Sequence, residues 1–232
     1  MNFFERIYGV FFQPKETMAD IVRKKPVWQG VLVLILVGLL SSLLAFKLGP
    51  FGQVSLTEPG LPHTPGFNHF NNLFFVFIVF ASIFINPILY FVNAAIYHFI
   101  AEVLGGEMYW KEENEEREEV ILGTGRGLYS AVCFSVLPSI FSALISPIIT
   151  KVSGAGGIII SIIVSIGVFV WVAILNIIAI KENYKLSTGN ATLVFFLPAI
   201  VVIVIGIIVI LILGSAFLGI FSDIMRGMPP MQ

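Results

Sequence analysis

Two apolar stretches of the sequence carry hydrogen-bonding side chains at helical spacing. In the first, Asn86, Tyr90, Asn93 and Tyr97 recur at i, i+4, i+7 and i+11, which places them on one face of a helix. Amide and phenol groups can bind a polar solute or hold a neighbouring helix, and in an apolar helix they face protein or water rather than lipid. We therefore expect other helices to cover this face.

A second face of the same kind is built of serines. Ser135, Ser139, Ser142 and Ser146 follow the same spacing, and small hydroxyl residues let helices approach closely and form hydrogen bonds across the contact. We expect these serines to pack against the asparagine and tyrosine face and to form a polar seam with it. Asn176 is a further candidate member of the seam. The alternative is that the seam lines a conducting pore.

The same residues do not predict catalysis. A serine nucleophile needs a neighbouring base, and no intramembrane histidine, aspartate or lysine lies in register with the serines. His98 and Glu102 are four residues apart but lack the third ligand of a catalytic metal site, so we interpret them as a hydrogen bond near a helix end. Cys133 is the only cysteine, and we expect it to be a small buried core residue. We predict neither an enzyme nor a cofactor or metal site.

One region of the sequence is strongly charged. Six glutamates fall between residues 112 and 119, without the turn residues that a calcium loop places among its acids. We interpret this region as a solvated acidic helix. It is also a candidate cytoplasmic contact for other proteins, through Glu112, Glu113, Glu116 and Glu119.

The composition shows which elements must position these residues. The chain of 232 residues is 57% hydrophobic and 12% charged, against about 25% charged residues in soluble proteins, which excludes a soluble domain. Because about 20 apolar helical residues cross a bilayer, the sequence predicts an all-α integral membrane protein with five transmembrane helices. Their approximate ranges are residues 27–46, 73–104, 127–150, 158–180 and 191–213.

Prolines and glycines bend and connect the predicted spans. Pro87, Pro138 and Pro198 interrupt three of the spans and are expected to break their regularity. Glycines between residues 154 and 157 make a short turn, so the third and fourth spans should be antiparallel neighbours. Residues 47–72 are rich in glycine and proline and predict a loop without regular structure.

The two ends of the chain have different patterns. Residues 1–26 form two short amphipathic segments with aromatic faces and basic neighbours, which suits an interfacial position at the lipid headgroups. Packing of the same face on the protein's own spans is the alternative. Residues 214–232 form a C-terminal tail that extends the fifth helix or lies along the interface.

The distribution of lysine and arginine predicts the orientation of the spans. Ten of these residues lie before the first span and in the loops on the same side, and three lie on the opposite side. Because lysine and arginine are enriched in cytoplasmic loops, we expect the N-terminus in the cytoplasm and the C-terminus outside.

Three stretches of the sequence resemble the Yip1 domain family. Residues 11–36 contain a Phe-x-Pro motif and a Lys-Pro-x-Trp step that leads into the first span. Residues 127–141 combine small residues with Pro138, and residues 171–200 run from Trp171 through Tyr184, Leu186 and Ser187. The resemblance implies five spans with the orientation given above, and no catalytic residue follows from it.

The resemblance also suggests a function. Eukaryotic members resemble adaptors of early secretory traffic that interact with prenylated Rab-type GTPases and with one another. The 26 residues before the first span are similar to the short prokaryotic members, which makes a GTPase partner doubtful and implies a prokaryotic plasma membrane.

We therefore expect a non-enzymatic adaptor or scaffold of the cell membrane. It would contact membrane lipids and other membrane proteins, or further copies of itself, but no nucleic acid. The alternative function is a small transporter or channel for a neutral solute or lipid, which would use the polar seam between the second and third spans.

Overall fold

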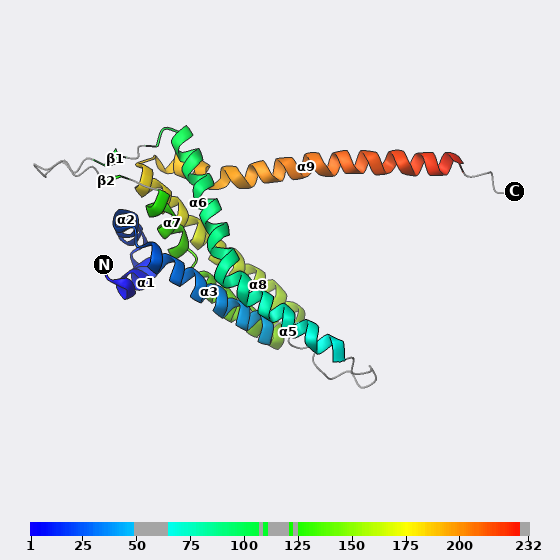
Figure 1. Ribbon diagram of the computed structural model, residues 1–232, viewed down its shortest axis with the longest axis horizontal. Coiled ribbons are helices and arrows are strands. Elements are labelled where there is room, and N and C mark those ends of the chain that lie inside the picture. The colour runs from blue at the N-terminus through cyan, green and yellow to red at the C-terminus, as the bar shows by residue number, and fades with distance from the viewer. Residues whose placement is uncertain (49–64, 107–108, 111–120, 123–124, 228–232) are drawn as a thin grey trace, which may run out of the picture.

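The structure is a computed structural model, and it describes residues 1–48, 65–106, 109–110, 121–122 and 125–227. The described chain is almost entirely helical (Figure 1). Its helices are α1 (Phe3–Phe12), α2 (Pro14–Lys24), α3 (Val27–Leu48), α5 (Pro65–Phe80), the π-helix η1 (Ala81–Ile85), α6 (Asn86–Val103), α7 (Gly125–Phe134), α8 (Ser139–Tyr184) and α9 (Thr188–Gly227). Two residue pairs, β1 (Tyr109–Trp110) and β2 (Ile121–Leu122), form a short antiparallel ladder.

Five helical segments within the described residues are long and apolar enough to cross a membrane. They are Val27–Phe46, Leu73–Val103, Gly125–Ile145, Gly156–Tyr184 and Thr188–Ser215. The prediction of an all-α membrane protein with five spans is therefore confirmed. Four of the spans form a bundle, and α9 packs on it only near its first turns and then points away (Figure 1).

The third span forms the core of the bundle. In its most apolar window 61% of the residues are buried, against 22% or less in each of the other four spans. Its helix α7 packs against α2, α3, α6 and α8, and side chains such as Leu128 and Phe134 are fully buried. Cys133 is also fully buried there, which confirms its interpretation as a core residue.

Two of the three prolines lie at irregular points of their spans. Pro87 is the second residue of α6, and Asn86 separates it from the π-helix η1. The wider turn of the π-helix accommodates a residue that cannot donate a backbone hydrogen bond. The Tyr129 hydroxyl donates to the Pro87 carbonyl oxygen at 3.1 Å and ties this irregular turn to α7. Pro138 closes the turn at residues 135–138 that separates α7 from α8. Pro198 lies inside the unbroken helix α9, so the expected interruption of the fifth span is wrong.

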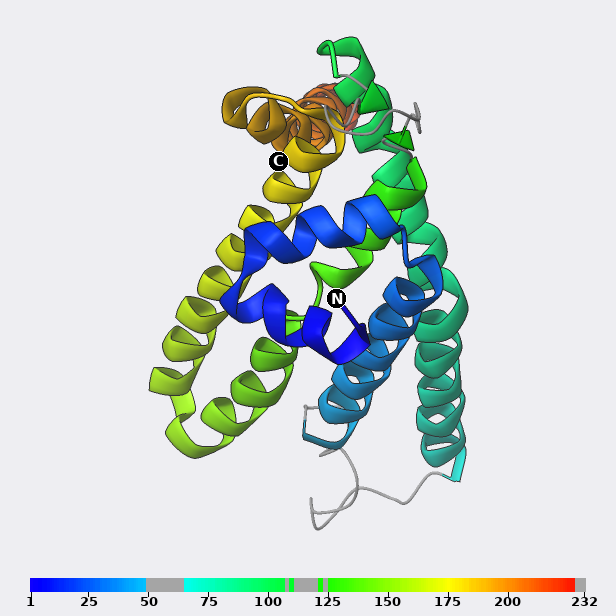
Figure 2. The ribbon, with the colours of Figure 1, turned by 90° about the vertical axis from the view of Figure 1, so that its left-hand side faces the viewer.

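The helix α8 folds back on itself (Figure 2). The hydroxyl oxygens of Ser142 and Ser165 lie 3.2 Å apart, whereas 23 residues of a straight helix would separate them by about 35 Å. The first part of α8 (residues 139–150) and its second part (residues 156–184) are therefore antiparallel neighbours. This arrangement agrees with the short glycine turn predicted from the sequence.

Two helices extend further than the sequence suggested. The helix α5 begins at Pro65, so the prediction of a loop without regular structure is wrong for residues 65–72. Proline is favoured at the first position of a helix because its missing N–H has no partner there in any case. At the other end of the chain, α9 runs without a break to Gly227, so residues 214–227 extend the fifth helix.

The first two helices lie across the front of the bundle (Figure 2). A capping box between Asn2 and Glu5 starts α1, and Pro14 starts α2. On their inner side Val10, Met18 and Ile21 are fully buried in the core shared with α3, α7 and α8. The N-terminal segment therefore packs on the protein's own spans through one face, as one of the two alternatives predicted.

A polar network joins α1 and α2 to the start of α3. The Arg6 guanidinium donates to Asp20 Oδ2 at 2.9 Å and also to the side-chain oxygen of Gln29. Lys24 Nζ lies 3.0 Å from Asp20 Oδ1. Partial burial acts to raise the pKa of Asp20, but the hydrogen bonds from Lys24 and Arg6 outweigh it, so this pKa lies below the ordinary value of 3.8.

This network predicts a stability that depends on pH. Because the pKa of Asp20 is lowered on folding, its carboxylate stabilises the protein above about pH 4, and this contribution is lost as the pH falls through the lowered pKa. We expect the melting temperature of the wild type to exceed that of Asp20→Asn at pH 6, and this difference to shrink as the pH falls below 3.8, the ordinary pKa of the carboxyl group. Thermal unfolding in detergent across this range measures the difference. A difference that persists unchanged at pH 3 would contradict the assigned role.

Candidate functional site

The candidate site depends on small residues in α3, which lies between the second span and α8. Gly38 and Ser42 lie on one side of this helix, and Ser41 and Ala45 lie on another. Each pair has the four-residue spacing at which small side chains let neighbouring helices approach closely.

The first pair contacts the irregular part of the second span. Ser42 and Ser82 share a hydrogen bond of 2.9 Å between their hydroxyl oxygens. The amide nitrogen of Asn86 lies 3.3 Å from the position that a Cβ atom would take at Gly38. Ser42 Oγ also lies 2.7 Å from the Gly38 carbonyl oxygen, and Ser82 Oγ lies 2.9 Å from the Ile78 carbonyl oxygen. Because each hydroxyl has one proton, two of these three contacts can be donated at a time. The π-helix is therefore held against α3 by a small, satisfied polar contact.

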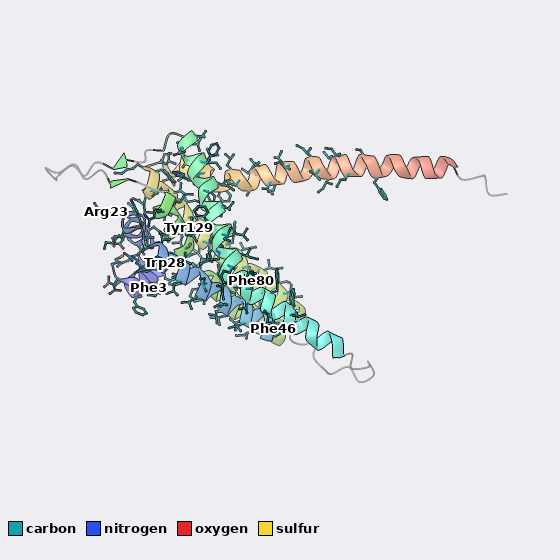
Figure 3. The ribbon with its side chains drawn as sticks, in the orientation of Figure 1. Phe3, Arg23, Trp28, Phe46, Phe80 and Tyr129 are labelled. Atoms are coloured by element: carbon teal, nitrogen blue, oxygen red, sulfur yellow. The ribbon has the colours of Figure 1, made fainter. Side chains whose placement is uncertain are left out.

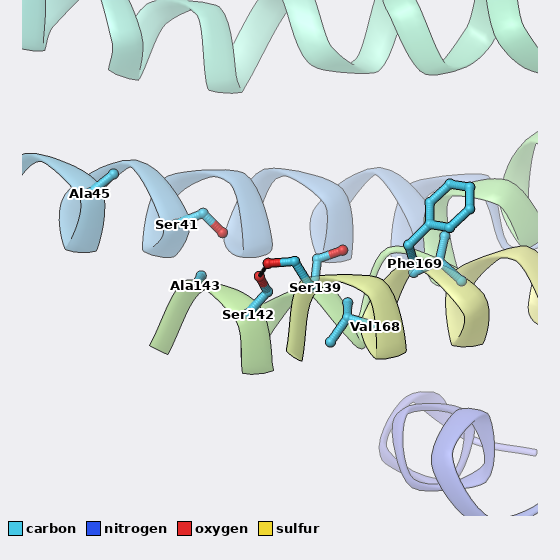
Figure 4. A pocket seen from close by; sticks show the side chains of 9 residues that line it. Ser41, Ala45, Ser139, Ser142, Ala143, Val168 and Phe169 are labelled. Atoms are coloured by element: carbon cyan, nitrogen blue, oxygen red, sulfur yellow. Dashed lines mark hydrogen bonds between the residues drawn. The ribbon is translucent and has the colours of Figure 1, made fainter. Parts of the chain in front are cut away.

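The second pair lines an open groove between α3 and the two parts of α8 (Figure 4). Its volume is about 510 Å³. Four serines contribute hydroxyl groups to it, Ser41 from α3, Ser139 and Ser142 from the first part of α8, and Ser165 from the second part. We call this feature the serine groove.

Alanines and larger apolar residues complete the serine groove. Ala45 and Ala143 widen it, and Val168, Phe169 and Val172 form its wall on the second part of α8. The groove is open along its edge, where Ala45, Ser165 and Phe169 are exposed. Ser41 lies about 20 Å along α3 from its first residue. Since a bilayer core is about 30 Å thick, the groove lies in the half of the core that is distant from the start of α3.

The serine groove can form hydrogen bonds but has no means of activating a nucleophile. Its lining contains hydroxyl groups and apolar side chains and no acid, base or cation. A serine hydroxyl becomes an effective nucleophile only when a neighbouring base accepts its proton. In the described part of the chain, no group of three histidine, cysteine, aspartate or glutamate side chains could hold a metal ion.

The predicted asparagine and tyrosine face does not meet the serines of the groove. Asn86 lies against α3, and Tyr90 packs where the two hydrophobic clusters of the core adjoin. Asn93 donates to the Tyr97 hydroxyl at 3.4 Å, and the Tyr97 ring lies 5.8 Å from that of Phe195 in α9. This face is covered by protein, as predicted: Asn86 lies against α3, and Tyr97 packs with α7, α9 and the end of α8. The helix α3 separates Asn86 from the serine groove.

The predicted serine stripe is divided by the break at Pro138. Ser139 and Ser142 line the serine groove, whereas Ser135 is buried in the turn before α8 and donates to the Val132 carbonyl at 2.7 Å. The side chain of Ser146 is outside the described residues. Asn176 is buried one helical turn beyond the groove and donates to the Val172 carbonyl at 2.8 Å.

His98 and Glu102 are joined by a third residue that the sequence did not suggest. His98 Nε2 lies 3.6 Å from Glu102 Oε1, so the two are neighbours near the helix end but too far apart for the predicted hydrogen bond. The other ring nitrogen of His98 lies 2.5 Å from the Tyr184 hydroxyl, and this bond connects α6 to the end of α8. The acidic residues Glu112, Glu113, Glu116 and Glu119 are outside the described residues.

The residues that sequence reasoning missed are those of α3. Gly38, Ser41, Ser42 and Ala45 form two small-residue pairs in the first span, and their spacing was a readable signal. Ser165 lies in the fourth span, and the fold of α8 places it beside Ser142.

These spans and their small-residue contacts define a multi-pass membrane protein whose site is formed between helices. The chain belongs to the Yip1 domain family, since the family model described as Yip1 domain matches residues 8–211. The match extends from α1 to the exposed part of α9 and includes every residue of the serine groove. Searches of the curated proteins and of the solved structures gave no match.

Proposed function

We propose that this protein is a non-enzymatic membrane adaptor that holds a transmembrane helix of another membrane protein, or of a further copy of itself, in the serine groove. The observation that carries the proposal is the groove itself, which is open along the bundle and lined by small residues from three helical segments. A helix can approach such a surface closely, and the hydroxyl groups can form hydrogen bonds with it.

The chemistry of the serine groove supports a helix as its occupant. Ser165 is exposed at the groove edge, and the one hydrogen bond that its hydroxyl shares with Ser142 leaves capacity for another. At this depth lipid chains offer no hydrogen-bond partner. A partner helix with serine, threonine or small residues would satisfy these groups and fill the space beside Ala45 and Ala143. Charged side chains are not required, because the groove lining contains none.

We also propose the orientation and the membrane. The excess of lysine and arginine before the first span and in the loops on the same side supports a cytoplasmic N-terminus. In this orientation the serine groove lies in the outer half of a prokaryotic plasma membrane. The glutamates between residues 112 and 119 would then lie in the cytoplasm, where they are a candidate second contact for a partner.

The proposal predicts that filling the groove releases the partner. We expect Ser142→Leu to reduce partner recovery about ten-fold, since loss of about 1.4 kcal/mol of binding free energy corresponds to that factor. The measurement is purification from native membranes in a gentle detergent, followed by native mass spectrometry. Gly167→Leu is the matched control, because no atom lies within 4 Å of the Cβ position at Gly167 and it adds the same side chain.

The same measurement separates the two candidate functions. Equal recovery of a partner with Ser142→Leu and with Gly167→Leu would place the partner elsewhere on the protein. A protein without any partner, but with a lipid or small molecule that Ser142→Leu displaces, would favour transport of a neutral solute or lipid. A volume of about 510 Å³ is in the range of small-molecule sites, which is the observation that keeps this second candidate.

A further inference from the structure

The helix α1 has a second face that its packing on the bundle leaves unused. Phe4, Tyr8 and Phe12 follow one another at intervals of four residues and are 78%, 60% and 67% exposed. The rings of Tyr8 and Phe12 stack with their centroids 4.5 Å apart. These three side chains form an aromatic stripe on the opposite side of α1 from buried Val10.

The depth of α1 in the membrane follows from its contacts with α3. Arg6, in the middle of α1, donates to Gln29 in the first turn of α3. Since the first candidate span begins at Val27, α1 lies at the level where the chain enters the bilayer. Trp28 belongs to the same level and is 86% exposed (Figure 3). Tryptophan and tyrosine are enriched at this depth because their rings are apolar and their edges polar.

The charges near the stripe complement a membrane surface. The helix α2 and the residue after it carry the cations Lys15, Arg23, Lys24 and Lys25 and the acids Glu16 and Asp20. Asp20 is bound by Arg6 and Lys24. Helices with an aromatic apolar face and basic neighbours bind the headgroup layer, and basic residues add affinity for anionic lipids.

We propose that α1 is an in-plane membrane anchor. Its aromatic stripe of Phe4, Tyr8 and Phe12 lies in the lipid headgroup layer, at the level of Trp28, where α3 begins. The basic residues of α2 face anionic headgroups. The helix α1 also contacts both sides of the turn at residues 135–138 in the third span. The ring centroids of Phe3 and Phe134 lie 6.5 Å apart, and those of Phe11 and Phe141 lie 5.5 Å apart. The anchor therefore connects the leaflet surface to the core of the bundle, independently of what occupies the serine groove.

The test is the depth of a single tryptophan. In a background with Trp28, Trp110 and Trp171 replaced by phenylalanine, Tyr8→Trp reports on the stripe and Phe3→Trp on the inner face. The full chain is reconstituted in phosphatidylcholine vesicles that carry bromine atoms either near the ester end or near the methyl end of the acyl chain. We expect the shallow bromines to quench Tyr8→Trp about twice as strongly as the deep ones, and Phe3→Trp to be quenched little by either.

Two outcomes would overturn the proposal. Quenching of Tyr8→Trp no stronger than that of Phe3→Trp would mean that water or a protein covers the stripe. The second test keeps native Trp28 and replaces the other two tryptophans, so that α1 carries no new side chain. Failure of the shallow bromines to quench Trp28 would also overturn the proposal.

The basic residues are tested by lipid charge. We expect phosphatidylglycerol in the vesicles to raise the melting temperature of the wild type more than that of Lys15→Gln/Lys25→Gln. An equal rise in melting temperature in both proteins would show that Lys15 and Lys25 do not bind anionic headgroups, which would contradict this part of the proposal.

Discussion

Gly127→Ala is expected to destabilise the fold strongly. A Cβ atom at residue 127 would lie 2.6 Å from the Val22 carbonyl oxygen and 3.1 Å from Asn183 Oδ1. The closer of these atoms belongs to the backbone of α2, so it cannot move aside as a flexible side chain could. Overpacking of a core costs about 1–3 kcal/mol and sometimes more, and here the strained contact joins α2, α7 and the end of α8.

The neighbouring glycine provides the control for this substitution. No atom lies within 4 Å of the Cβ position at Gly125, which is also in α7. We expect Gly125→Ala to give a monodisperse protein with a melting temperature near that of the wild type, and Gly127→Ala to aggregate or to unfold at a clearly lower temperature. Size-exclusion chromatography and thermal unfolding in the same detergent measure both. Equal behaviour of the two variants would show that α2 does not pack against α7 as the structure has it.

Tyr184→Ala is expected to have an effect of similar size. Tyr184 is the largest of the fully buried side chains, and it fills the space where α6, α7 and the end of α8 meet. Its hydroxyl lies 2.5 Å from His98 Nδ1. Removal of a large buried aromatic side chain costs about 3–5 kcal/mol, so we expect a large fall in melting temperature and in the yield of folded protein.

A second substitution at the same residue separates packing from hydrogen bonding. Tyr184→Phe keeps the ring and removes the bond to His98, which is worth about 1 kcal/mol. We expect it to retain most of the stability that Tyr184→Ala loses. If Tyr184→Phe were as damaging as Tyr184→Ala, the hydrogen bond to His98 rather than the packing would hold α6 to α8.

Hydropathy predicted the spans because a bilayer sets the length of an apolar helix. It could not predict which spans are neighbours. The asparagine and tyrosine face and the serine stripe were each recognisable from their spacing, and each is covered at least in part, but α3 lies between Asn86 and the serine groove. Spacing identifies a face of one helix and contains no information about the helix that covers it.

The N-terminal segment illustrates the same limit at smaller scale. Its amphipathic pattern favoured the lipid interface and the protein's own spans equally. In the structure, Val10 is fully buried against the bundle while Tyr8 is largely exposed, so one face of α1 packs on the bundle and the other is exposed among the residues that the structure describes. The sequence alone could not divide the aromatic residues between these two faces, because the apolar arc covers most of the helix.

The measurement that tests the central claim most directly is crosslinking from the serine groove in native membranes. A short diazirine side chain in place of Ser165, which is exposed at the groove edge, is activated by light before any detergent is added. The control has the same side chain in place of Gly167, which is not among the residues that line the groove and has no atom within 4 Å of its Cβ position. The account predicts a discrete protein adduct from residue 165 that is absent from residue 167. Adducts with lipid alone from both positions would contradict it.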